Sequence, residues 1–114
     1  MGDNLKYAAQ KLGDFVDCLT LGPGRIAERL QSGFLSLSAV QAKDFEGTPF
    51  GTVYEDIQSI SSNKPNAGRG TRHATLTAMS EDEARELARR IVKLRDDVDE
   101  HLAAREALPS RHRS

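Results

Sequence analysis

The 114-residue chain contains no tryptophan, two tyrosines and four phenylalanines. A hydrophobic core must therefore be built from Leu, Ile, Val and Ala, a set that suits helices packed on helices better than a β-sandwich. The same shortage of aromatic side chains argues against a surface on which nucleic-acid bases stack.

Cysteine and long apolar runs are also scarce. Cys18 is the single cysteine, which excludes an internal disulfide and favours a reducing compartment, because small secreted proteins usually carry an even set. The sequence has no apolar N-terminal leader and no run of about 18 apolar residues of the kind that crosses a membrane. We therefore expect a cytoplasmic protein without membrane contact.

Neither sign of charge is in excess. Sixteen basic and 17 acidic residues give a formal net charge of -1, so the total charge predicts no polyanionic partner. The composition, 38% hydrophobic and 29% charged, is typical of a folded chain. At this length we expect one domain around one core.

The first half of the chain predicts two helices joined by a sharp corner. Apolar residues recur at three- and four-residue steps from residue 3 to residue 20. Gly22 and Pro23 are expected to end this helix, with Gly22 in a left-handed conformation. Because proline is favoured in a first helical turn, the same corner is expected to begin a second helix over residues 24–36.

The connector that follows is ambiguous, since residues 38–47 fit either one helical turn or an extended segment. Thr48 and Pro49 are the residue types of an N-cap and a first helical position, and the apolar spacing behind them predicts a third helix over about 49–61.

A loop and a short element come next. The stretch from Ser61 to Gly70 is rich in residues that favour turns and predicts a loop. Residues 71–79 permit a short strand or two turns of helix, and we favour the helix because no second strand is available for pairing.

The strongest pattern is a long last helix. Ser80 and Glu83 have the spacing of a capping box, and an apolar stripe behind them predicts a helix from 81 to about 107. On this helix Glu81 with Arg85, and Glu86 with Arg90, are expected to form ion pairs one turn apart.

The length of this helix matters. It would measure about 40 Å, whereas a globule of this size is about 35 Å across, so the helix end should bend, fray or project. Pro109 is expected to end it. Residues 109–114 would then be a disordered basic tail beyond a single domain of residues 1–108. Together these elements predict an all-α fold, a four- or five-helix bundle with a long C-terminal helix.

Basic residues at two places are candidates for binding an anion or a nucleic acid. Arg25 follows the glycine-rich corner at a helix start, where free amides suit a phosphate or carboxylate; the alternative is an ordinary helical corner. Arg69, Arg72 and His73 gather at the predicted loop and, joined by the tail from Arg111 to Arg113, would contact a nucleic-acid backbone. The alternative is a solvated, charged loop.

Five residues separate Arg95 from His101, and a polar residue directly follows the arginine. This resembles the R-x4-6-H motif of HEPN-type ribonucleases, which are small all-α bundles, and the resemblance implies that Arg95 and His101 act in acid–base cleavage at the RNA 2′-hydroxyl. In a continuous helix the two side chains would point about 120° apart. The alternative is therefore a salt-bridged helix face, with Asp97 one turn before His101. No metal-ligand spacing or cofactor motif is found, so neither a metal nor a cofactor is expected.

Three stretches carry a broader resemblance: Leu19 to Leu30, Lys43 to Phe45, and Ala74 to Ser80. Over roughly residues 5–102 the chain resembles a loose group of short uncharacterised bacterial helical proteins. The resemblance implies a bacterial, cytoplasmic, single-domain protein and brings no activity and no site residues with it.

These observations favour a non-enzymatic interaction, regulatory or accessory protein. We expect it to dock through its long C-terminal helix on a protein partner or on a second copy of itself. A nucleic-acid-associated protein that uses Arg69, Arg72 and the tail is the alternative, and a ribonuclease that uses Arg95 and His101 is the third.

Overall fold

A computed structural model describes residues 3–22, 24–61 and 71–112, and these residues contain helices and no strand. This confirms the predicted all-α class with a long C-terminal helix. In chain order the elements are α1 (Asp3–Leu21), α2 (Ile26–Ser36), the short 3-10 helix η1 (Ala42–Phe45), α3 (Phe50–Ile60), α4 (Thr71–Ala78) and α5 (Glu81–His112).

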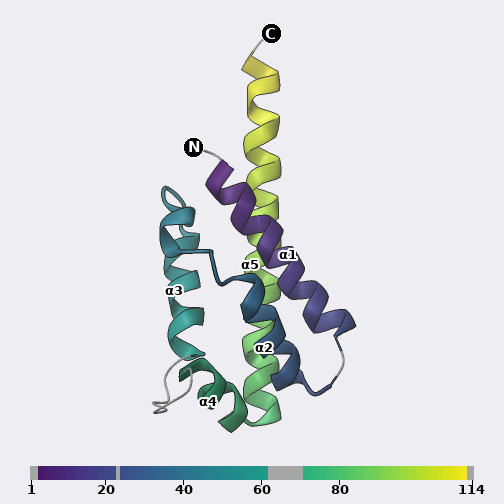
Figure 1. The fold of residues 1–114 in the computed structure, drawn as a ribbon. Coiled ribbons are helices and arrows are strands. Elements are labelled where there is room, and N and C mark those ends of the chain that lie inside the picture. The colour runs from purple at the N-terminus through teal and green to yellow at the C-terminus, as the bar shows by residue number, and fades with distance from the viewer. Residues whose placement is uncertain (1–2, 23, 62–70, 113–114) are drawn as a thin grey trace.

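The long helix α5 is the spine of the fold. α1 and α2 form a hairpin that packs on α5, and α3 packs on another part of the same helix (Figure 1). α4 contacts α2 near the beginning of α5, which leaves α5 as the element that the three other long helices share. The result is an elongated bundle with extents of 57 × 26 × 19 Å.

One continuous core fills the space between these helices. It uses the apolar stripes that the sequence predicts on α1, α2, α3 and α5, and it also takes in side chains from α4 and from the connector around η1. The largest fully buried core side chains are Leu12, Phe15, Leu30, Phe45, Tyr54, Ile57, Leu76, Leu87, Ile91, Leu94 and Val98. Burial of this aliphatic surface is the main term that stabilises the fold.

Gly33 allows α1 and α2 to approach closely. A Cβ atom at this position would overlap the ring of Phe15, which is completely buried on α1. The Phe15 ring also meets the ring of Phe34 edge-on, with centroids 4.8 Å apart and planes 77° apart, a geometry that aromatic pairs prefer. The hairpin is therefore held by a ring that lies against bare backbone.

The corner between α1 and α2 differs from the prediction. Gly22 does not take the left-handed conformation, because its amide still donates to the Cys18 carbonyl at 3.0 Å and extends the ladder of α1. The left-handed residue is Gly24, with φ of 90°, so α2 begins at Ile26 and not at residue 24. Pro23, which was expected in the first turn, lies outside the described residues.

A single arginine holds this corner together. The guanidinium of Arg29 donates through Nη1 to the Leu19 carbonyl and through Nε to the Gly24 carbonyl, both at 3.1 Å. A cation near the C-terminus of α1 also interacts favourably with the helix dipole. A side chain of α2 therefore satisfies a carbonyl oxygen at the end of α1.

The ambiguous connector at 38–47 resolves into η1, one short helical turn. It is fixed by Tyr54 of α3, whose buried hydroxyl donates to the Val40 carbonyl at 2.8 Å and whose ring packs on Phe45 at 4.9 Å. α3 begins one residue later than predicted, with Pro49 and not Thr48 at the N-cap position, although Thr48 Oγ1 still accepts the Phe50 amide at 3.2 Å.

The last two helices begin as the sequence predicts. α4 confirms the preference for helix over residues 71–79. The Ser80–Glu83 capping box is also confirmed, since the Glu83 amide donates to Ser80 Oγ at 3.1 Å and the Ser80 amide donates to Glu83 Oε1 at 2.9 Å. The loop predicted over 61–70 lies outside the described residues except for Ser61, which is buried.

The end of α5 also differs from the prediction. The helix continues past Pro109 to His112, because a proline removes one main-chain hydrogen bond and biases a helix to end without forcing it to do so. The tail expected from residue 109 therefore begins as helix. The last turns of α5 project beyond the N-terminal end of α1, which is one of the three outcomes that the length of the helix predicts (Figure 1).

Replacing Gly33 with Ala tests the close approach of α1 and α2. We expect Gly33→Ala to lower the free energy of unfolding by about 1–3 kcal/mol, because the Phe15 ring has no room to withdraw. Gly13→Ala is the matched control: it lies in helix α1, a Cβ there meets nothing within 4 Å, and it should gain about 0.5–1 kcal/mol. Urea unfolding of both variants decides the matter, and equal shifts of the same sign would contradict the account.

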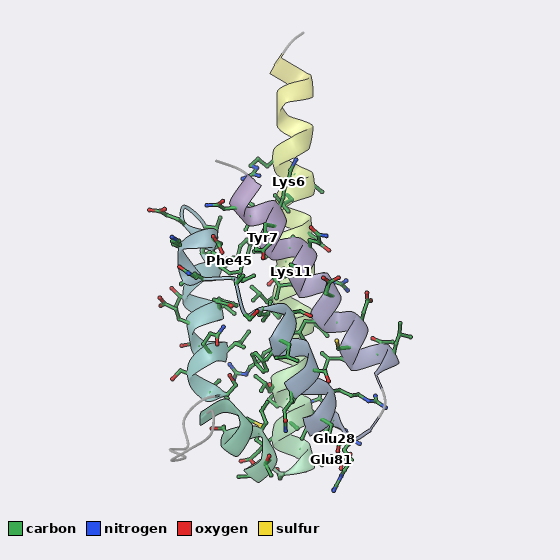
Figure 2. All side chains as sticks on the ribbon, in the orientation of Figure 1. Lys6, Tyr7, Lys11, Glu28, Phe45 and Glu81 are labelled. Atoms are coloured by element: carbon green, nitrogen blue, oxygen red, sulfur yellow. The ribbon has the colours of Figure 1, made fainter. Side chains whose placement is uncertain are left out.

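The chain's two tyrosines provide a second test. Tyr54→Phe leaves the buried Val40 carbonyl without the hydroxyl that it accepts from, and should cost about 1–3 kcal/mol of stability. Tyr7→Phe is the control, because Tyr7 is 39% exposed on α1 and keeps the ring over which Lys11 lies (Figure 2). Thermal unfolding should show a clear decrease for the first variant only.

Candidate functional site

The exposed face of α5 carries the densest group of charges among the described residues. Its cations and anions are paired along the helix, one position or about one turn apart. The pairs are Glu81–Arg85 at 2.9 Å, Glu86–Arg89 at 3.1 Å, Glu86–Arg90 at 3.8 Å, Lys93–Asp97 at 3.1 Å, Arg95–Asp96 at 2.9 Å and Arg95–Asp99 at 3.7 Å. The two pairs predicted from spacing, Glu81–Arg85 and Glu86–Arg90, are among them. Each such surface pair contributes little to stability.

The charges in the middle of α5 are also ordered along the helix. Basic residues predominate between Arg85 and Arg95, with Glu86 among them, and the acidic residues Asp96, Asp97, Asp99 and Glu100 follow at once. Because a helix turns once every 3.6 residues, both signs reach the exposed face. This face therefore presents a basic band followed by an acidic band.

An apolar groove of about 540 Å³ runs beside these bands. Its floor is built from Leu19 at the end of α1, Ile26 at the start of α2, and Ala88 and Val92 of α5. Its rim is charged and belongs to α5: Arg89, Lys93, Asp96 and Asp97. An apolar floor with a charged rim is typical of surfaces that bind other proteins.

A larger cavity, about 720 Å³, lies between the end of α3, α4 and the start of α5. Its walls include Thr75, Met79 and Leu87 together with Glu83 and Glu86. Glu83 is held in the capping box and Glu86 is paired with two arginines. The carboxylates of this cavity are therefore already engaged within the protein.

Arg25, the predicted anion-binding residue, is surrounded by acids. Its backbone amide donates to Glu28 Oε1 at 2.9 Å, so a carboxylate already lies at the start of α2. Arg25, Glu28 and Glu81 line one pocket between the beginnings of α2 and α5, where the two glutamates are labelled side by side in the view (Figure 2). A phosphate would have to compete with these carboxylates.

The other predicted nucleic-acid residues are only partly within the described chain. Arg69 lies outside it. Arg72 and His73 fall in α4, and Arg111 and His112 fall at the end of α5, where the helix is described and the side chains are not. Nucleic-acid binding by these residues stays a prediction.

Arg95 and His101, the predicted ribonuclease pair, are engaged on different surfaces. Arg95 lies between Asp96 and Asp99, as above. The ring of His101 meets the Phe50 ring of α3 edge-on, with centroids 5.5 Å apart and planes 87° apart. Asp97, the expected neighbour of His101, pairs with Lys93 instead. His101 therefore helps to join α3 to α5, a role that no local pattern in the sequence indicates.

Two further features bear on the predicted chemistry. Cys18 is a free thiol, half-buried near the end of α1. Within residues 3–22, 24–61 and 71–112, no three His, Cys, Asp or Glu side chains are grouped so that they could hold a metal ion, and no helix there is both long and apolar enough to span a membrane.

The exposed face of α5 and its groove are thus the clearest candidate site in the described part of the chain. Compared with known proteins, the chain matches no family model, no curated protein and no solved structure.

Proposed function

We propose that this protein is a non-enzymatic accessory or regulatory protein of the bacterial cytoplasm that works by docking on a protein surface. The docking surface is the charged face of α5 together with the groove that it borders. The observation that carries the proposal is the apolar floor of Leu19, Ile26, Ala88 and Val92 beside a rim of charged side chains.

The energetics of this surface support docking. Covering the apolar floor contributes roughly 25 cal/mol for each Å² removed from water, against which the cost of association is set. The rim charges are paired within α5 at modest strength, so a partner can exchange these contacts for its own at little cost. Apolar contacts would then supply affinity, and the charged rim would supply specificity.

The free thiol of Cys18 supports the proposed compartment, because single unpaired cysteines are usual in reducing environments. The engagement of Arg95 by acids and of His101 by Phe50 favours docking over RNA cleavage as the role of α5.

Photo-crosslinking in the native host tests the docking surface. A photoreactive residue replaces Arg89, a rim residue whose side chain is 71% exposed, and a control chain carries it at Lys43, which is exposed on η1 away from the groove. We expect several-fold more crosslinked product from position 89. Equal yields from both positions, or none from position 89, would refute the proposed surface.

A further inference from the structure

Four charged residues form one row on the exposed face of α5. Arg89, Lys93, Asp96 and Glu100 follow one another at steps of four, three and four residues, a spacing that keeps them on one side of a helix. The side chains of Arg89, Lys93 and Asp96 are 71%, 77% and 61% exposed. In sequence order, the row consists of two cations followed by two anions.

We propose that a second copy of this chain covers this row, with the two α5 helices antiparallel about a two-fold axis that crosses each helix between Leu94 and Arg95. This inference rests on the proposed function and names the partner of the same surface. In a two-fold interface every contact occurs twice, once in each direction. Lys93 then lies opposite Asp96 of the partner subunit, and Arg89 lies opposite Glu100 of the partner subunit.

The order of the charges selects this arrangement. A parallel pair of α5 helices in register would place Lys93 opposite the same lysine, and Asp96 opposite the same aspartate, so every contact in the row would be repulsive. The antiparallel arrangement makes every contact in the row attractive. Of the parallel in-register and the two-fold antiparallel arrangements, only the antiparallel one makes the row complementary to itself.

The projecting end of α5 fits the same register. Among the helices that the structure describes, none lies beside the turns of α5 that extend beyond the body of one copy (Figure 1). About the axis between Leu94 and Arg95, residues 102–108 lie beside residues 81–87 of the second copy. The C-terminal end of one helix thus lies beside the N-terminal end of the other, and antiparallel helix dipoles attract.

The second helix would also close the groove. Arg89, Lys93 and Asp96 belong both to the charged row and to the groove rim, so a helix lying along the row covers the mouth above Ile26 and Val92. In the dimer, Lys93 and Asp96 would interact with the partner subunit and also with Asp97 and Arg95 of their own helix. The dimer should therefore be of modest affinity and sensitive to salt.

Sedimentation equilibrium at low salt tests the dimer. From about 1 µM to about 1 mM protein, the weight-average mass should rise from 12.5 kDa toward twice that value, and added salt should reverse the rise. A mass that stays at 12.5 kDa over the whole range overturns the proposal.

Charge exchange tests the register. Lys93→Glu should weaken dimerisation by about tenfold or more, because it places two acids opposite each other. Adding Asp96→Lys to the same chain restores opposite charges at both positions and should restore the dimer. Lys43→Glu makes the same charge change on η1 and should leave the dimer intact, while circular dichroism checks that every variant folds.

The outcomes distinguish a wrong register, a wrong partner and a wrong proposed function. A wild-type dimer that Lys93→Glu does not weaken, or that the double variant does not restore, overturns the antiparallel register. If the chain is monomeric but position 89 crosslinks to another protein, the second copy is wrong and the proposed docking surface stands. If position 89 yields no product, the proposed function fails independently of the mass.

Discussion

The contact of the Phe15 ring with the bare backbone at Gly33 is the constraint on which the rest of the structure depends. It sets the distance between α1 and α2, and that distance decides whether the two helices present one joined apolar surface to α5. Packed interiors respond to such contacts by moving whole elements, because they contain little free space. The groove depends on the same spacing, since Leu19 and Ile26 lie on either side of the hairpin corner.

Features that depend on residues close together in the chain could be predicted. The capping box at Ser80 and Glu83, the pair Glu81–Arg85 and the apolar stripe of α5 all depend on separations of three or four residues, and helix geometry fixes what lies at those separations. The left-handed residue at the corner between α1 and α2 was harder to predict. Gly22 and Gly24 both permit a left-handed backbone, and which of them adopts it depends on how far the main-chain hydrogen bonds of α1 continue. Arg29 of α2 stabilises that end of α1 through its hydrogen bond to the Leu19 carbonyl.

Features that join distant parts of the chain could not be predicted. The groove floor combines residues 19, 26, 88 and 92, and the ring contact of His101 reaches back to Phe50. No spacing rule covers such separations, because they depend on how the helices pack. The surroundings of Arg25 show both cases: Glu28 lies one turn away in the sequence, whereas Glu81 reaches the same pocket only through the fold.

The length of α5 gives it a mechanical property as well. Its 32 residues form one rod about 48 Å long, which begins beside α4 and ends beyond α1. Because α1, α2 and α3 all pack on this rod, its base cannot turn without moving the helices that pack on it. A displacement at the α4 end would therefore reach the opposite end of the molecule only as a movement of the whole bundle.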